Sequence, residues 1–187
     1  HQYDRRFAGT QKLYGTKQFS LFENTHAYVI GVGGVGTWAA EGLARSGVGE
    51  ISLIDMDVLV ASNVNRQLPA LADNFGKSKI DAMAERIRQI NPLVRLHLID
   101  DFLTTDNVTA LLPHRSTYHQ LKQAGKRVVI LDCVDDMAAK LAIALHCRFN
   151  KLPLIMSGGA GGKTDPLAIT VSDLKDTYQD PLLAKVR

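Results

Sequence analysis

Residues 31–36 form a glycine-rich segment of the kind that binds phosphate groups. Gly31, Gly33 and Gly36 satisfy the spacing G-x-G-x-x-G, and Gly34 adds a fourth glycine. In this pattern the first glycine permits a tight turn, the second lets a ligand approach the backbone, and the third lets a helix pack closely on a strand. The helix that follows offers free N–H groups to an anion. The segment therefore predicts nucleotide binding, and the alternative is a glycine-rich turn without a ligand.

Two carboxylates follow the next apolar stretch. Asp55 ends the strand that we expect over residues 50–55, about 20 residues after the glycines, where a carboxylate can accept hydrogen bonds from ribose hydroxyls. The alternative for Asp55 is a surface acid at the end of a strand. Asp57 could contact the nucleotide or orient Arg66, and the sequence leaves both roles open. Up to this point the pattern also fits a nicotinamide-dependent oxidoreductase or a nucleotide-binding module without catalysis.

The motifs that follow Asp55 favour a different chemistry. A D-x-D pair is followed by S-N-x-x-R-Q, which contains Asn63 and Arg66, and then by G-x-x-K, which ends in Lys79. This series resembles the adenylating domain of the ubiquitin-activating-enzyme-like superfamily, which includes the activators of bacterial sulfur carriers. Residues 131–136, LDCVDD, are similar to the superfamily's L-D-x-x-D-N, with an aspartate in the usual place of the asparagine.

The chemistry of adenylation explains these residue types. When a carboxylate attacks the α-phosphate of ATP, negative charge develops at phosphorus and on the departing pyrophosphate, and fixed cations must face that charge. Arg66 can bind phosphate oxygens as a planar fork, and Lys79 supplies a point charge. The resemblance places Asp135 where the superfamily holds Mg²⁺, a cation that prefers oxygen ligands. Taken singly, these residues could be a loop-capping Arg, a surface Lys and a helix-capping Asp.

The resemblance thus implies ATP and Mg²⁺ as cofactors. It implies that Arg66, Lys79 and Asp135 are catalytic and that Asp135 is the metal ligand. The nucleotide-binding residues that it implies are Gly31, Gly33, Gly34, Gly36, Asp55, Asp57, Asn63, Arg66 and Lys79.

One branch of the superfamily is similar to the chain nearly from end to end. Residues 6–10 (RFAGT), 13–15 (LYG), 87–92 (IRQINP) and 158–166 (GGAGGKTDP) resemble the tRNA threonylcarbamoyladenosine dehydratases. The resemblance implies ATP-dependent dehydration of that nucleoside in tRNA. The threonyl carboxylate is adenylated and a ring then closes by intramolecular attack, with release of AMP and pyrophosphate. The alternative is an adenylating activator of a ubiquitin-like sulfur carrier, against which the missing C-x-x-C pairs also speak.

The same resemblance implies partners. They are a modified tRNA and a second copy of the chain, because superfamily dimers can lend an N-terminal basic residue to the partner's ATP. Arg5, Arg6 and Lys12 are the candidates for that residue. The branch also leaves room for a cysteine desulfurase or sulfur-acceptor partner. We expect a cytoplasmic protein without a membrane span, since no apolar run approaches about 18–20 residues.

The elements that must position these residues alternate between strand and helix. This alternation predicts an α/β, Rossmann-like fold with a mostly parallel sheet and helices on both faces. We expect a single nucleotide-binding adenylating domain over 1–187, with an N-terminal helical arm over 1–25 and a C-terminus that is incomplete. The expected strands are 26–30, 50–55, 94–99, 128–132, 154–156 and 167–171. The expected helices are 11–24, 35–46, 77–90, 106–112 and 136–150, of which Asp106 caps the fourth.

Residues 113–127 form a basic insertion with two readings. The segment contains four Arg and Lys residues and no acid, although the whole chain carries a net charge of only +3. We favour a solvated surface insertion, and a phosphate-contacting loop is the sharper alternative.

The cysteines and histidines carry little functional signal. Cys133 and Cys147 cannot form a disulfide framework or a four-cysteine zinc site, and we interpret both as core residues. The six histidines show no metal-ligand spacing, and we interpret His97, on its strand, as structural.

Overall fold

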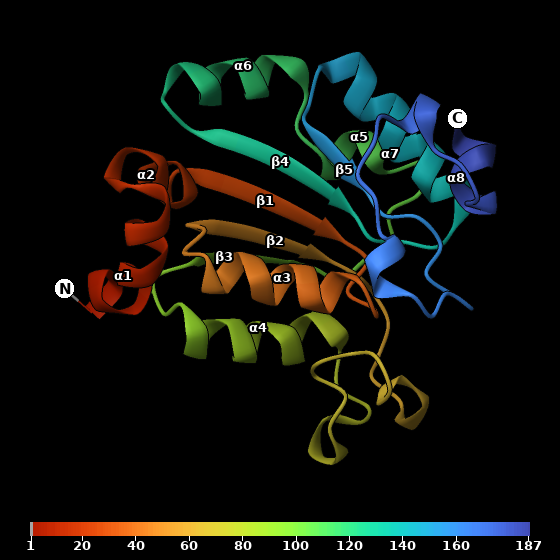
Figure 1. The fold of residues 1–187 in the computed structure, drawn as a ribbon, viewed down its shortest axis with the longest axis horizontal. Coiled ribbons are helices and arrows are strands. Elements are labelled where there is room, and N and C mark those ends of the chain that lie inside the picture. The colour runs from red at the N-terminus through yellow and green to blue at the C-terminus, as the bar shows by residue number, and fades with distance from the viewer. Residues whose placement is uncertain (1) are drawn as a thin grey trace.

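One parallel sheet organises residues 2–187, the part of the chain that the structure, a computed structural model, describes (side chains from residue 3). Its strands are β1 (Thr25–Ile30), β2 (Glu50–Ile54), β3 (Arg95–Ile99), β4 (Arg127–Asp132) and β5 (Leu154–Met156). Their order across the sheet is β3-β2-β1-β4-β5, and every neighbouring pair is parallel (Figure 1). The predicted α/β, Rossmann-like fold is confirmed, and the sheet is parallel throughout.

Helices cover both faces of the sheet. They are α1 (Gln2–Tyr14), α2 (Thr16–Glu23), α3 (Gly36–Arg45), α4 (Lys79–Ile90), α5 (Val108–Leu111), α6 (Arg115–Gln123), α7 (Met137–Asn150) and α8 (Pro181–Val186). Because strand side chains alternate between faces, successive residues of one strand enter different cores. Val29 packs in a core with α3 and α4, whereas Ile30 packs in a second core with α5 and α7.

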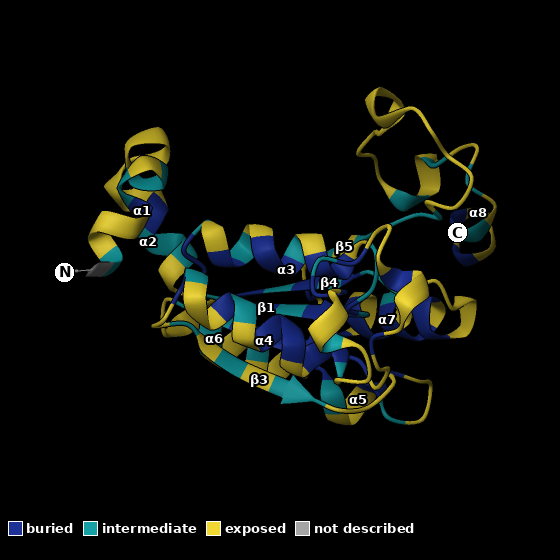
Figure 2. Cartoon of the chain, turned by 90° about the horizontal axis from the view of Figure 1, so that it is seen from below, coloured by how far each residue is buried: buried dark blue, intermediate teal, exposed yellow. Residues whose placement is uncertain are grey.

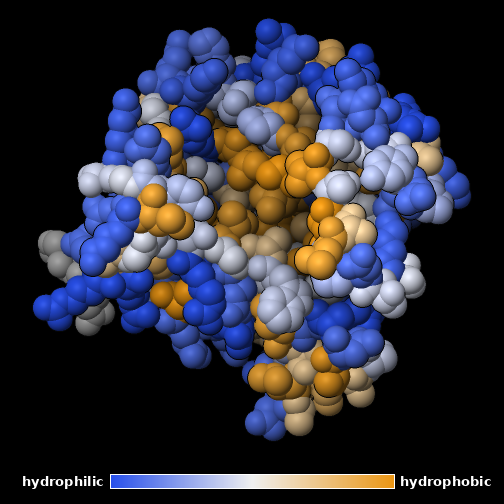
Figure 3. Space-filling model, viewed as in Figure 1, coloured by the Kyte–Doolittle hydropathy of each residue, from blue (hydrophilic) through white to orange (hydrophobic). Residues whose placement is uncertain are grey.

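The face that carries α3 is covered unevenly. Helices α3 and α4 lie over β1, β2 and β3, whereas no described helix lies over β4 and β5 on that side (Figure 1). Ile155 of β5 is consequently 61% exposed, and Figure 3 shows an apolar hollow over this part of the sheet. Figure 2 shows that the segment after β5 is mostly exposed as well.

Three predicted elements differ from the structure. The strand expected over 167–171 is wrong. Pro166–Ala168 is a 3₁₀ turn, and Val171 is 99% exposed, because this stretch does not pair with any strand of the sheet. The single helix expected over 11–24 is two helices, because Gly15 adopts φ +82° between them. Asp106 does not cap α5; the cap residue is Asn107, whose side chain accepts a hydrogen bond from Thr104 N (2.7 Å).

The basic segment 113–127 is mainly helical. Helix α6 occupies its centre and packs against β4 through the half-buried Tyr118 and Leu121. The helix has no buried residue, so it lies on the surface as the favoured reading expects. Its last turn and the residues that follow lead into the first residue of β4, Arg127. Lys122, Lys126 and Arg127 therefore lie toward the amino end of the sheet.

Candidate nucleotide site at the carboxyl ends of the strands

The predicted site residues gather where the strand order reverses. The chain leaves β1 toward α3 on one face of the sheet and leaves the neighbouring β4 toward α7 on the other face. Open α/β sheets bind ligands at such a switch point. Gly31 N donates to Ile54 O (2.9 Å), and Cys133 N donates to Ile30 O (2.8 Å). The glycine segment is thereby held between the ends of β2 and β4.

The glycines of the segment differ in why glycine is needed. Gly31 has φ +84°, a conformation that favours glycine. A Cβ on Gly36 would lie 1.8 Å from the carbonyl oxygen of Gly31, and a Cβ on Gly34 would lie 3.0 Å from the Arg66 side chain. A Cβ on Gly33, in contrast, would meet no atom nearer than 3.9 Å. The protein itself therefore leaves space at Gly33, as the close approach of a phosphate requires.

Asp55 braces the glycine segment. Its Oδ2 accepts a hydrogen bond from Val32 N (2.7 Å), and its Oδ1 accepts one from Asp57 N (2.8 Å). The residue is only 7% exposed. Each carboxylate oxygen has a second lone pair, so these bonds leave capacity for ribose hydroxyls. The structure thus adds a positioning role that the sequence did not indicate.

Asp57 and Lys79 form an ion pair across the loop between β2 and α4. Lys79 Nζ lies 2.7 Å from Asp57 Oδ2, and Lys79 N donates to Asp57 O (2.9 Å). The lysine is buried although it begins a helix, a place where the helix dipole disfavours a cation. Of the two roles left open for Asp57, orienting Arg66 is not observed, because the aspartate holds Lys79 instead.

Arg66 presents its guanidinium group at the surface. Its Nη1 donates to Ser62 O (3.1 Å) and Asn65 Oδ1 (2.8 Å). Asn63 shapes this loop, because its carbonyl oxygen accepts from Arg66 N (3.1 Å) and its Oδ1 accepts from Val60 N (3.1 Å). The buried Asn63 therefore acts on the loop, while the exposed Arg66 keeps donors free for a phosphate.

The acidic residues after β4 have separate roles. Asp136 caps α7, accepting a hydrogen bond from Ala139 N (2.7 Å), which explains how aspartate serves where the superfamily has asparagine. Asp135 is exposed, and its side chain makes no hydrogen bond or ion pair with the described residues. Its carboxylate is therefore available to an external cation.

Two buried polar groups near the site were missed from the sequence. Lys140 on α7 is fully buried with Asp132 at the end of β4, their Nζ and Oδ2 atoms 3.0 Å apart. Burial raises the pKa of the Asp132 carboxyl, and Lys140 opposes this effect. Gln67, 6% exposed, lies beside Gly33, and its Oε1 has no hydrogen-bond partner among the described residues. The sequence did contain a signal for Gln67, because this residue directly follows Arg66 in the S-N-x-x-R-Q motif.

The cysteines and the N-terminal basic residues complete the set of predicted residues. Burial raises the pKa of the Cys133 and Cys147 thiols to about 12, which agrees with core residues rather than nucleophiles. Arg6 donates to the carbonyl oxygens of Gln89 (3.2 Å) and Ile90 (3.3 Å) at the end of α4. None of the described helices has the length and apolar character that a bilayer crossing requires.

The sheet order and the glycine segment after β1 define a protein of the Rossmann-like α/β class. A family model described as the ThiF family matches residues 3–185, and the chain belongs to this family. It is 49% identical over 183 residues to the tRNA threonylcarbamoyladenosine dehydratase of Escherichia coli K12, covering 98% of this chain and 64% of that protein. It is 43% identical over 185 residues to the protein of the same name from Haemophilus influenzae, covering 99% and 67%.

A solved structure extends the similarity to three dimensions. The Escherichia coli dehydratase in complex with ATP superposes with a TM-score of 0.87 at 49% identity, covering 98% of this chain and 71% of that one. These relatives confirm the resemblance seen in the motifs. The chain spans slightly less than two thirds of the length of the Escherichia coli relative.

Proposed function

We propose that this chain binds ATP and carries the adenylating chemistry of a tRNA threonylcarbamoyladenosine dehydratase. The observation that carries the proposal is the 49% identity, over 98% of the chain, to a relative of that name whose structure has been solved with ATP. The site supports it independently, because Arg66 lies against the glycine segment at the switch point of the sheet and Lys79 stands at the start of α4, after the neighbouring strand β2.

ATP is proposed to lie across the carboxyl ends of β1, β2 and β4. Its phosphates approach the backbone at Gly33, and its ribose lies near Asp55. Arg66 then faces the α-phosphate from the surface, and Lys79 reaches it by exchanging Asp57 for a phosphate oxygen. These charges act on the negative charge that grows in the transition state, so they accelerate adenylation more than they tighten ground-state binding.

The reaction that we propose is acyl adenylation followed by cyclisation. An oxygen of the threonyl carboxylate attacks the α-phosphorus, the bond to the bridging oxygen breaks, and pyrophosphate leaves. The activated carbonyl is then attacked from within the same nucleoside, and AMP leaves as the ring closes. The second step needs little beyond activation and positioning, so no enzyme thiol is required. The raised pKa of both cysteine thiols, which keeps them protonated at pH 7, is compatible with this route.

Asp135 is the residue that we propose as the ligand of Mg²⁺. The fit is supported by its exposure, by its lack of an internal partner and by its place at the end of β4. Mg²⁺ bound there with the phosphates would neutralise charge on the triphosphate.

We propose a modified tRNA and a second copy of this chain as partners, with a cytoplasmic location. For the basic residue reaching the partner's ATP, Arg5 and Lys12 are better candidates than Arg6, which is engaged at the end of α4. A cysteine desulfurase or sulfur-acceptor system is a further proposed partner, to be tested by co-purification.

The deciding experiment offers two substrates to the same protein. ATP and Mg²⁺ are supplied with either tRNA bearing threonylcarbamoyladenosine or a carrier protein ending in Gly-Gly, and products are identified by mass. We expect a nucleoside lighter by one water, formed with AMP and pyrophosphate. A carrier adenylate formed while the tRNA stays intact would replace this proposal with a sulfur-carrier activator.

A further inference from the structure

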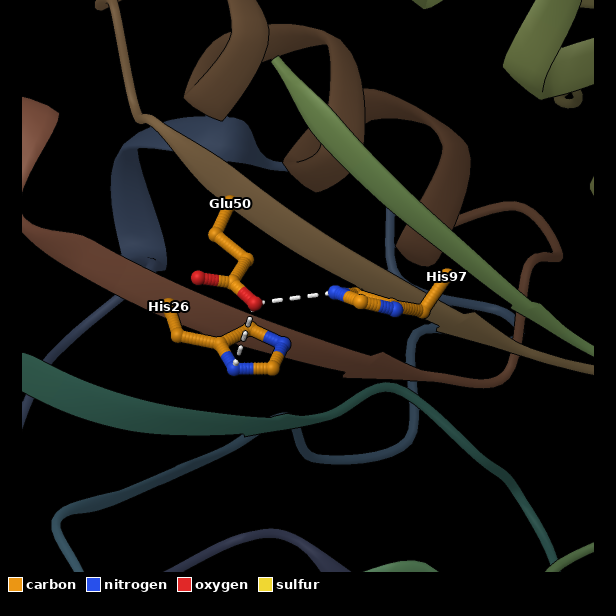
Figure 4. Close-up of side chains that lie close together, drawn as sticks. All are labelled: His26, Glu50 and His97. Carbon is orange, nitrogen blue, oxygen red and sulfur yellow. Dashed lines mark hydrogen bonds and ion pairs between the residues drawn. The ribbon is translucent and has the colours of Figure 1, made fainter. Parts of the chain in front are cut away.

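A second cluster of ligand-bearing side chains lies at the opposite, amino end of the sheet. His26 stands on β1, Glu50 on β2 and His97 on β3, and one potential metal-binding atom from each lies within 4.8 Å of the others. Figure 4 shows the three side chains pointing toward one another from adjacent strands. His26 is separated from the end of β1 by four residues, which is about 13 Å of strand.

Register brings these residues together. His26 pairs with Glu50 across β1 and β2, and Ser52 pairs with His97 across β2 and β3. Neighbours in a parallel register share a face of the sheet, so all of them point to the side opposite α3 and α4. His26 and Glu50 side chains are 14% and 15% exposed, whereas His97, on the edge strand, is 49% exposed.

From this geometry we propose that His26, Glu50 and His97 form a binding site for Zn²⁺. Glu50 Oε1 lies 2.9 Å from His97 Nε2 and 3.6 Å from His26 Nδ1. Ligand bonds of about 2.0–2.1 Å in a tetrahedral site separate ligand atoms by about 3.4 Å, which falls between these two distances. Two imidazole nitrogens and one carboxylate oxygen make a zinc donor set, and a fourth position remains for water.

Neighbouring groups already orient two of the three ligands. His26 Nε2 lies 2.8 Å from Ser52 Oγ, so an Nε2–H that donates to the hydroxyl leaves the Nδ1 lone pair directed at Glu50. The Tyr28 ring stacks on His26 with the ring centroids 4.2 Å apart. Arg95 Nη2 lies 2.5 Å from Glu50 Oε2, which leaves Oε1 for the metal. Such outer contacts are typical of metal ligands.

The surrounding charges set the expected affinity. The cations of Arg95 and Lys126 act on His26, and Arg95 also offsets the charge of Glu50. The nearby cations weaken attraction for a dication, and we expect a dissociation constant on the order of micromolar.

The bound ion would join three strands at the end of the sheet opposite the glycine segment. Its role is therefore stabilising rather than catalytic. At a hundredfold excess of Zn²⁺ over the dissociation constant, we expect the thermal midpoint to rise by about 5–10 °C. The proposal does not depend on the proposed ATP chemistry, because no residue is shared between the two sites.

Calorimetric titration of the tag-free chain with ZnCl₂ tests the proposal. We expect one saturable site that Mg²⁺ does not occupy, since Mg²⁺ prefers oxygen ligands. His97→Ala, on the half-exposed edge strand, should weaken Zn²⁺ binding at least tenfold and abolish the thermal shift. His119→Ala on the surface helix α6 is the matched control and should change the affinity less than twofold.

A second pair of measurements separates this site from others. Asp135→Asn should keep the Zn²⁺ affinity, and X-ray absorption should show two imidazoles in a shell of N and O atoms at about 2.0–2.1 Å. Unchanged binding in His97→Ala, loss in Asp135→Asn, a sulfur ligand or no saturable binding would each overturn the proposal.

Discussion

The two ends of the sheet position their functional side chains differently. At the carboxyl end, the glycine segment follows β1 and the charged residues stand after β2 and β4; the first residues after each strand are hydrogen-bonded to a neighbouring strand. At the amino end, His26, Glu50 and His97 stand on the strands themselves. A site built from loops can therefore be predicted from local sequence motifs, whereas a site built on strands depends on how distant segments of the chain pair.

The largest expected effect breaks the carboxyl end through its backbone. In Gly36→Ala the new Cβ meets the Gly31 carbonyl oxygen at 1.8 Å, so the turn must move. We expect a loss of about 3 kcal/mol in the free energy of unfolding, together with loss of ATP binding. Denaturant unfolding and nucleotide titration measure both quantities.

The same helix offers the matched control. Gly42 lies in α3 with no atom within 4 Å of an added Cβ, so Gly42→Ala should raise stability by about 0.5–1 kcal/mol. Equal stabilities of the two variants would show that the turn at Gly36 is not constrained as described.

Replacing Arg66 or Lys79 should lower the rate of adenylation, and replacing Arg66 should leave the free energy of unfolding almost unchanged. Arg66→Ala and Lys79→Ala should each slow adenylation by about 100-fold, because fixed donors matter most in the transition state. The exposed Arg66 contributes to stability by no more than about 0.5 kcal/mol. Pyrophosphate exchange measures the rate, and His119→Ala, on α6, should remain within twofold of the parent. Rates near the parent value in both cation variants would move the site elsewhere.

Replacing Asp55 should weaken ATP binding more than replacing its exposed neighbour Asp57. In Asp55→Asn an NH₂ group replaces one of the two carboxylate oxygens. This donor then faces the backbone N–H of Val32 or of Asp57, so one hydrogen bond is lost at a cost of about 1.5–3 kcal/mol. We expect ATP binding weakened by about 10- to 150-fold in a calorimetric titration. Asp57→Asn keeps an acceptor for Lys79 and leaves both backbone hydrogen bonds to Asp55 in place, so it should weaken ATP binding less than Asp55→Asn does. A larger effect at Asp57 would contradict the brace.

An ion pair between the two ends gives a smaller, pH-dependent effect. Hydrogen bonds from Arg86, and to a lesser extent Arg45, hold the pKa of Glu41 below its ordinary value and link α3 to α4. A depressed pKa stabilises the fold above the unfolded value of about 4.3, and the gain is lost as pH falls through the folded value. Glu41→Gln should therefore lose about 1 kcal/mol at pH 7 and less below pH about 4. A pH-independent difference in unfolding free energy would refute this link.

The smallest effect concerns the basic segment. Lys122, Lys126 and Arg127 lie toward the amino end, away from the glycine segment. Neutralising them together should change the slope of log K for tRNA against log salt by less than about 0.7, the value of one lost contact. Filter binding over a salt series measures this slope. A reduction of about 2–3 would restore the phosphate-contacting reading of residues 113–127.

Local patterns predicted the fold because every crossover between successive strands contains a helix. The alternation of strands and helices suffices for a parallel sheet, and the glycine spacing locates the turn before α3. Local propensity failed at 167–171, where an apolar stretch has no neighbouring strand. The motif also did not predict the ion pair of Lys79 with Asp57, because this contact depends on how the loop between β2 and α4 folds back.

The amino-end cluster could not be predicted from spacing. Its three residues come from three strands, and their meeting requires both the strand order and the register. A shift of one residue in the register of β3 would turn His97 to the opposite face. The histidine spacing along the chain therefore carried no signal, although the residues lie within reach of one ion.

The edge position of β3 has a consequence for self-association. An edge strand offers unpaired backbone groups to strands of other molecules, and exposed charges along it discourage such pairing. Arg95 and His97 place cationic and titratable side chains along this edge, and the opposite edge is the three-residue strand β5. The side chains that meet across β1, β2 and β3 thus also discourage strands of other molecules from pairing with this edge of the sheet.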